Sequence, residues 1–171
     1  MSKAVRITYG KHTYGAFKAT SGIITVGNFC SIAAGVNVII LADHQKDWVT
    51  TYPFTKRWGT KDTGNPVVKQ NPHVVVGNDV WIGQGAILLE DTVIGDGAIV
   101  GCYSVTHGEI PPYSIVVGNP ARVTSKRFTE NQIAALLRIQ WWNWEDDKIK
   151  EFAPLLSSSD VDRFIKESEN A

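Results

Sequence analysis

The amino-acid sequence predicts a mainly β protein, a parallel β-helix that carries an inserted loop and a C-terminal α-helical cap. Three observations lead to this fold class. An aliphatic residue recurs at every sixth position, a long polar and aromatic segment interrupts that repeat, and helical spacing replaces it from Phe128 onward. The chain has 171 residues, of which 43% are hydrophobic, which is enough for one domain with a sizeable core.

The six-residue repeat is the strongest of these signals. The recurring aliphatic residues are Val76, Ile82, Leu88, Ile94 and Val100, and glycine follows in four of the five cases. A compact residue stands four positions after each of them, at Val80, Ala86, Thr92, Ala98 and Ser104. Six residues can hold one short strand and one turn, so three units would make one triangular coil. Each coil can bury its apolar residues only by stacking on the next.

A β-sandwich with chance spacing is the alternative to this interpretation. Five successive aliphatic residues at one period, with a matched register of small residues, argue against it. The same phase occurs earlier, at Val26, Ile32 and Val38. We expect the glycines to ease tight corners of the coil, where a positive φ costs glycine little.

The remaining segments can be placed around these two blocks. Residues 1–25 are expected to form irregular edge structure that leads into the first coils. Val26 and Val76 are 50 residues apart, which is not a multiple of six, so an insertion at about 40–73 separates the blocks. A loop of this length is usually functional or disordered, and its aromatic content argues against disorder.

The repeat slips after Val100 and gives way to helices. Thr106 takes the aliphatic position, and the two adjacent prolines that follow Ile110 predict a turn. Thr129 and Gln132 are spaced as a helix capping box. We therefore predict a β-helix domain over residues 1–127 and a helical extension over 128–171.

Composition excludes several classes of partner. Lysine plus arginine equal aspartate plus glutamate, 17 against 17, so nothing suggests a nucleic acid or an anionic membrane. No apolar run is long enough for a bilayer, and the N-terminus lacks the features of a signal peptide. The two cysteines are too few for a disulfide framework. These features favour a reducing, cytoplasmic setting.

Several segments resemble a known family. The coil Val76-Gly-Asn-Asp-Val-Trp-Ile-Gly-Gln-Gly-Ala86 and the ending Val117-Gly-Asn-Pro-Ala-Arg-Val123 resemble those of hexapeptide-repeat acyltransferases. The segment 43–54 and the tail 127–144 resemble the xenobiotic branch, which acetylates chloramphenicol or streptogramins. The resemblance extends from Tyr9 to about Ile165. It implies left-handed winding of a single-stranded β-helix, although general rules favour right-handed crossovers. It also implies a homotrimer that binds acetyl-CoA between neighbouring prisms.

The resemblance also implies that His44 is the catalytic base. Acyl transfer needs a group that takes the acceptor's proton, and an imidazole titrates near neutrality. Asp43 or Asp47 could orient the ring; the family usually has asparagine where this chain has Asp43. Without the flanking resemblance, a lone loop histidine would be read as a solvated surface group.

Candidate acceptor contacts are partly on the insertion. Aromatic faces suit sugar rings or hydrophobic drugs, although packing within the loop or a trimer contact would explain these side chains equally well. Trp81 precedes an inward-facing residue and should point outward, which is typical of an interface. The candidates are Asp47, Tyr52, Phe54 and Trp81.

Cofactor contacts can be assigned only from the resemblance. It implies that residues matching Gln84, Cys102, His107, Gly108 and Arg122 meet CoA, although the family commonly has Thr-Lys at the positions of His107 and Gly108. With Arg122, the basic residues Lys126 and Arg127 form a cluster that could contact the CoA phosphates. A solvated charged turn is the alternative for each of the three.

Together these features predict an acetyl-CoA-dependent O- or N-acetyltransferase. The acceptor would be a small molecule, with a sugar or a nucleotide-linked amino sugar favoured. An antibiotic-inactivating O-acetyltransferase is one alternative, and a non-catalytic scaffold subunit is another. A zinc enzyme on the same fold would need two closely spaced histidines, which His12, His44, His73 and His107 do not provide, so no metal is expected.

Overall fold

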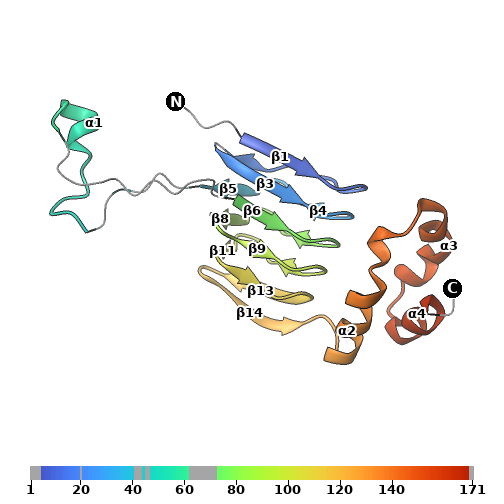
Figure 1. Ribbon diagram of the computed structural model, residues 1–171. Helices are drawn as coiled ribbons and strands as arrows, with labels where there is room; N and C mark the ends of the chain where they lie inside the picture. The colour runs from blue at the N-terminus through green and yellow to red at the C-terminus, as the bar shows by residue number, and fades with distance from the viewer. Residues whose placement is uncertain (1–4, 20, 41–43, 45–46, 62–72, 170–171) are drawn as a thin grey trace.

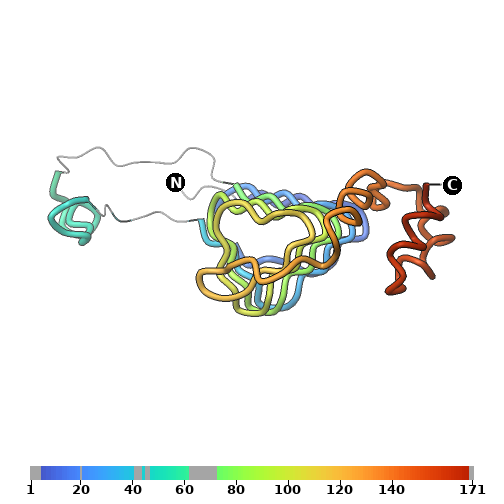
Figure 2. Tube along the Cα trace, turned by 90° about the horizontal axis from the view of Figure 1, so that it is seen from below, coloured from blue at the N-terminus to red at the C-terminus, as the bar shows by residue number. Residues whose placement is uncertain are grey.

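Three sheets of short strands form the sides of a triangular prism (Figures 1 and 2). The computed structural model describes residues 5–19, 21–40, 44, 47–61 and 73–169. Sheet A has the strand order β1-β3-β6-β9-β12, sheet B has β14-β13-β10-β7-β4, and sheet C has β11-β8-β5-β2. All pairs are parallel except β13 with β14.

The strands are two to six residues long. Their bounds are β1 Val5–Tyr9, β2 Lys18–Ala19, β3 Gly22–Val26, β4 Ser31–Ile32, β5 Asn37–Ile39, β6 His73–Val76, β7 Trp81–Ile82, β8 Ile87–Leu89, β9 Val93–Ile94, β10 Ile99–Val100, β11 Val105–Thr106, β12 Glu109–Ile110, β13 Ser114–Gly118 and β14 Ala121–Lys126. The helices are α1 Phe54–Trp58, α2 Glu130–Ile139, the 3-10 turn η1 Trp141–Asn143, α3 Asp146–Leu156 and α4 Val161–Ser168.

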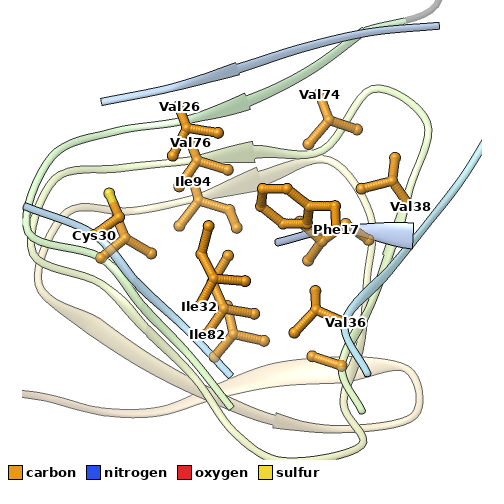
Figure 3. Packing of buried hydrophobic residues seen from close by; sticks show 14 of the residues in the cluster. Phe17, Val26, Cys30, Ile32, Val36, Val38, Val74, Val76, Ile82 and Ile94 are labelled. Carbon is orange, nitrogen blue, oxygen red and sulfur yellow. The ribbon is translucent and has the colours of Figure 1, made fainter. Parts of the chain in front are cut away.

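The six-residue repeat is confirmed, because its aliphatic residues stack coil upon coil. In sheet A, Val26 pairs with Val76 and Val76 with Ile94. In sheet B, Ile82 lies between Ile32 and Val100. Figure 3 shows Val26, Val76 and Ile94 pointing into the prism from one of its sides and Ile32 and Ile82 from another. We call each such stack of inward-facing aliphatic residues a column. Since a buried aliphatic side chain contributes about 1.5–3 kcal/mol, these columns account for much of the stability of the fold.

Each coil has three corners, which we name after the sheets they join. The A–B corner comprises residues 27–30, 77–80, 95–98 and 111–113, and the B–C corner comprises residues 33–36, 83–86 and 101–104. The C–A corner comprises residues 90–92 and 107–108. The compact residues of the repeat lie at these corners and are buried: Val80, Ala86, Thr92, Ala98 and Ser104.

The glycines that follow the aliphatic residues serve a different purpose from the one expected. Gly27 and Gly77 do not have a positive φ. They are needed because successive coils approach closely: a Cβ on Gly27 would lie 2.5 Å from the carbonyl oxygen of Gly77. A polar ladder runs beside them, in which the Asn28 N–H donates to Asn78 Oδ1 (2.8 Å) and the Asn78 N–H to Asp96 Oδ1 (2.7 Å).

The expectation of irregular structure before residue 25 was wrong. β1 pairs with β3 over five residues and adds a further strand to sheet A. Tyr9 pairs with Val26, so an aromatic residue takes the place of the aliphatic one, which hides the repeat. Phe17 fills the interior below it, with its ring 6.3 Å from that of Tyr9.

The slip after Val100 has a simple geometric origin. Ile94 pairs with the residue 18 positions earlier, Val76, whereas Ile110 pairs with Ile94, 16 positions earlier. The last coil is therefore two residues shorter, and His107 and Gly108 alone turn its C–A corner. Thr106 keeps its inward position, and Thr92 Oγ1 donates to its carbonyl oxygen at 3.1 Å.

The insertion leaves the prism at the C–A corner, between the end of β5 and the start of β6. We call its described residues 47–61, together with His44, the arm. In Figures 1 and 2 α1 stands well away from the three sheets. α1 buries none of its residues, so the arm is not part of the prism's core.

The helices that follow β14 pack against the A–B corner. The Asn28 amide donates to the Trp142 carbonyl at 3.1 Å, and the rings of Phe29 and Trp141 are 4.9 Å apart. Trp142 is 1% exposed and belongs to a second apolar cluster with Tyr113 and Phe164. No helix among the residues that the structure describes is long and apolar enough to span a bilayer.

Candidate functional site

The predicted base, His44, lies on the exposed arm and is held by a backbone contact. Its Nδ1 is within hydrogen-bond distance of the carbonyl oxygen of Thr51. A carbonyl oxygen can only accept, so Nδ1 must carry the proton in this contact. In the neutral ring Nε2 is then the basic nitrogen, which is the state that a general base requires.

In the described structure Nδ1 of His44 thus contacts a backbone carbonyl, a group that the sequence did not suggest. Asp47 is exposed and makes no hydrogen bond with His44 among the described contacts. Asp43, the other candidate, lies outside the described residues. A backbone carbonyl could not have been found from the sequence, because every residue has one.

Three aromatic side chains of the arm form a cluster of their own. The ring centroids of Tyr52 and Phe54 are 4.8 Å apart, and those of Phe54 and Trp58 are also 4.8 Å apart. All three are exposed, and Trp58 is 70% exposed. Two of the predicted acceptor contacts, Tyr52 and Phe54, are thus brought together, and Trp58 completes an apolar surface that no part of the described prism covers.

Trp81, the remaining acceptor candidate, points outward from β7 as expected and is 52% exposed. It pairs with Ser31 above and Ile99 below on the outer face of sheet B. Sheet B is the side of the triangle opposite the C–A corner, where the arm leaves. A single chain therefore does not bring Trp81 and His44 together.

Two of the predicted cofactor contacts are neighbours at the B–C corner. Gln84 and Cys102 stand in successive coils, and both are exposed. Tyr103, which the sequence analysis missed, joins them: its N–H donates to the Gln84 carbonyl at 2.8 Å. Its ring lies over Gly85, where a Cβ would come within 2.4 Å of it. Tyr103 is 69% exposed, and no sequence pattern marks it out.

His107 and Gly108 lie across sheet C from these residues, at the C–A corner. His107 Nδ1 is 3.0 Å from the Glu90 carbonyl oxygen, so Nδ1 donates there as well. Gly108 has a positive φ and open space around it. The outer face of sheet C is thus bordered by predicted cofactor contacts on both of its long edges.

The three basic residues do not form one cluster in space. Arg122 is near the start of β14 and donates to the carbonyl of its neighbour, Ala121. Lys126, at the other end of the strand, pairs with Glu130 at 2.5 Å. Arg127 turns toward the A–B corner and pairs with Asp79 at 3.1 Å. Only Arg122 lies at the end of β14 that is next to the B–C corner.

Among the described residues, no three histidine, cysteine, aspartate or glutamate side chains gather as a metal ion would require. Both cysteines are free thiols, Cys30 buried and Cys102 exposed. Burial raises the pKa of the Cys30 thiol above its ordinary value, which keeps it protonated and unreactive.

Comparison with known proteins agrees with this architecture. The family model "Bacterial transferase hexapeptide (six repeats)" matches residues 73–108, which include strands β6 to β11. A hexapeptide-repeat-containing acetyltransferase from Vibrio cholerae, solved in complex with acetyl coenzyme A, is 25% identical, with a TM-score of 0.57 over 72% of this chain and 61% of that chain.

Curated relatives extend the match over most of the chain. Chloramphenicol acetyltransferase of Klebsiella aerogenes is 37% identical over 142 residues, which are 81% of this chain and 68% of the relative. A probable macrolide acetyltransferase of Lysinibacillus sphaericus is 40% identical over 139 residues, 79% of this chain and 77% of the relative. The chain belongs to the hexapeptide-repeat acetyltransferases, in the xenobiotic acetyltransferase branch.

Proposed function

We propose that this protein transfers an acetyl group from acetyl-CoA to a hydroxyl group of a small, partly hydrophobic acceptor, with His44 as general base. The observation that carries the proposal is the contact between His44 Nδ1 and the Thr51 carbonyl. It fixes the tautomer in which Nε2 can accept a proton. The same contact can persist in the imidazolium formed afterwards, because the carbonyl still accepts from the N–H of the charged ring.

The reaction needs a simple sequence of proton and bond changes on the protein's side. Acetyl-CoA supplies an acetyl group already activated as a thioester. Nε2 of His44 takes the proton as the acceptor oxygen attacks the thioester carbonyl, so the acceptor is bound within hydrogen-bond reach of that nitrogen. The C–S bond of the thioester then breaks, the imidazolium returns the proton to the CoA sulfur, and CoA leaves as the free thiol. No nucleophile on the protein is required for this direct attack.

The outer face of sheet C suits a long, flexible cofactor. Half-buried aliphatic side chains, Ile87 and Val105 among them, line that face. Polar groups border it: Gln84 on the B–C side and His107 on the C–A side. In this proposal these residues, with Cys102 and Gly108, hold the CoA chain, and the cationic Arg122 contacts a phosphate.

The separation of His44 from Trp81 supports a site shared between chains. The arm carries the base and the aromatic cluster away from its own prism, so a second copy is needed to complete an acceptor pocket. We therefore include in the proposal a homotrimer of left-handed single-stranded β-helices, residues 1–127 with the arm, in which each arm reaches a neighbouring prism. Residues 128–171 would be a helical extension outside the catalytic unit.

The most specific part of the proposal is the chemical class of the acceptor. The curated relatives are named for chloramphenicol and macrolides, which favours an antibiotic-like alcohol over the sugar that the sequence favoured. The cluster of Tyr52, Phe54 and Trp58 offers the apolar faces that such a molecule needs. A sugar hydroxyl or a nucleotide-linked amino sugar remains the second candidate, because aromatic faces also stack on sugar rings.

The test of the catalytic role is a measurement of thiol release from acetyl-CoA with the His44→Ala variant. Turnover should fall about 100-fold or more, because general-base catalysis is lost, while the affinity for acetyl-CoA stays nearly unchanged. His73→Ala, which removes another exposed histidine at the start of β6, should leave turnover unchanged. Full activity of His44→Ala would remove His44 from this role.

The same assay ranks the acceptors. Chloramphenicol, a macrolide, a streptogramin and a panel of sugars and nucleotide-linked amino sugars would be compared by kcat/KM. The proposal expects the highest value for one of the antibiotics. A higher value for a sugar would move the function to the second candidate. Failure of acetyl-CoA to bind by calorimetry would instead support a non-catalytic scaffold.

A further inference from the structure

The third residue of every turn at the A–B and B–C corners has a positive φ. At the A–B corner these residues are Phe29, Asp79, Gly97 and Tyr113, and at the B–C corner they are Gly35, Gly85 and Tyr103. Each N–H donates to the coil before it, as Gly85 does to the Ala34 carbonyl at 3.1 Å. We call the two sets the A–B stack and the B–C stack. They are built alike and can be compared position by position.

Tyr103 and Tyr113 hold their rings in the same way in the two stacks. A Cβ on Gly85 would lie 2.4 Å from a ring carbon of Tyr103, and a Cβ on Gly97 would lie 2.4 Å from a ring carbon of Tyr113. Each ring therefore rests against a glycine of the preceding coil, where no other residue would leave room for it.

The two tyrosines differ in what covers them. The Arg127 guanidinium lies 5.4 Å from the ring centroid of Tyr113, which is 1% exposed. Phe29, in the same stack, has its ring 4.9 Å from that of Trp141. Tyr103 is 69% exposed and has no aromatic or cationic neighbour among the contacts of the described residues. The C-terminal segment thus supplies flat partners at the A–B corner and leaves the ring at the B–C corner bare.

The exposed ring is nevertheless held in position. Gln84 Nε2 donates to the Tyr103 hydroxyl at 3.4 Å. Gly35 and Gly85 carry no side chain, so nothing in the B–C stack projects over the ring from the coils above. A bulky residue with a positive φ is uncommon, and such backbone strain is concentrated at functional sites. The ring is therefore a preformed flat surface with a face open to a ligand.

A cation lies below the same corner. A Cβ on Gly101 would touch the side chain of Val117, so β13 ends directly beneath Tyr103 and its neighbours. Arg122 pairs with Val117 across β13 and β14. Two strand spacings, about 9–10 Å, thus separate Gly101 from Arg122. An aromatic face with an arginine at this separation suits a base and its attached phosphates.

We propose that Tyr103 stacks on the adenine ring of acetyl-CoA, so that the nucleotide end of the cofactor lies at the B–C corner. The inference rests on the proposed placement of CoA along sheet C and adds to it a contact and a direction. Adenine is the flat aromatic group of CoA, and the phosphates beside it suit the Arg122 guanidinium. Aromatic side chains commonly bind bases in this way, because every base has a π-face.

The experiment is an NMR titration of CoA with the full chain, in which the adenine H2 and H8 resonances are followed. Stacking on a tyrosine ring should move both resonances upfield when the native protein binds. Tyr103→Asn removes the ring, and asparagine tolerates a positive φ. This variant should bind CoA about ten-fold more weakly and lose the upfield shift. Tyr103→Phe, the matched control, keeps the ring and should retain both.

Two results would overturn the proposal. One is that Tyr103→Asn binds CoA as tightly as the native protein. The other is that its binding is weaker while the upfield shift remains, because the ring would then support only the fold. Should Tyr103→Asn fail to fold, Tyr103→Gly introduces the residue type already present at Gly35 and Gly85.

The role of His44 is tested separately by the same measurement. His44→Ala should lose turnover but show the native adenine shift, since the base and the nucleotide contact are different groups. Native turnover without an adenine shift would reject the Tyr103 contact and leave the proposed function standing. A native protein that does not bind CoA at all would reject both.

Discussion

Gly97 illustrates how little space the stacked coils leave for a side chain. It is buried at the A–B corner, has a φ of +69°, and carries the Tyr113 ring directly above its Cα. Two physical demands meet at this residue. The left-handed backbone disfavours any side chain, and the ring occupies the volume that a methyl group would need.

Gly97→Ala should therefore destabilise the protein by about 2–5 kcal/mol, since backbone strain of about 1–2 kcal/mol and overpacking of about 1–3 kcal/mol add. Gly108→Ala is the matched control, because Gly108 has a φ of +73° but nothing within 4 Å of its missing Cβ. Gly108→Ala should therefore lower the free energy of unfolding only by the backbone strain, about 1–2 kcal/mol. Urea denaturation of both variants measures the difference, and equal losses would contradict the steric account.

The repeat was predictable from the sequence because a buried aliphatic column requires one residue type at fixed intervals. Where a residue of another type fills a position of the column, the six-residue pattern can no longer be recognised in the sequence. Tyr9 occupies the column position of Val26 in β1, which is why that strand was missed. The reason for the glycines was also wrong, because close approach between coils is a property of pairs such as Gly27 and Gly77 that are far apart in sequence.

The candidate site was less predictable than the scaffold. His44 was singled out by its flanking residues, but the group that its Nδ1 contacts in the described structure is a backbone carbonyl. The supposed cluster of Arg122, Lys126 and Arg127 is dispersed, because a strand separates successive residues by about 3.3 Å and carries them to opposite corners.

The arm is an addition to the prism rather than a part of its core. The neighbouring coil passes from β8 to β9 with only residues 90–92, and β5 and β6 pair with those same strands. Replacing residues 40–74 with Glu-Asp-Thr, the sequence of 90–92, should therefore preserve the β-sheet circular dichroism spectrum. Acetyl transfer should fall at least about 100-fold, because the base is removed. A shortened protein that keeps its turnover would contradict the role of the arm.

For the molecule as a whole, the exposed surfaces indicate association. Large apolar side chains remain uncovered on the arm and on sheet B, Trp58 and Trp81 among them. Exposed apolar surface of this kind usually marks an interface. We expect sedimentation equilibrium at neutral pH to give a mass three times that of the 18.8 kDa chain. Trp81→Ala should shift the equilibrium toward smaller species, and a native protein that sediments as a monomer at all concentrations would contradict the proposed trimer.

The direction of β14 has a consequence for how the prism ends. A stack of parallel coils leaves open strand edges, to which the first coil of another molecule could add indefinitely, as in a fibril. β14 reverses course and pairs antiparallel along β13, covering the lower edge of sheet B. A strand arriving there in the prism's own orientation would meet a neighbour that runs the opposite way. One reversed strand thus limits the length of the prism and keeps this end of sheet B from serving as a template for growth.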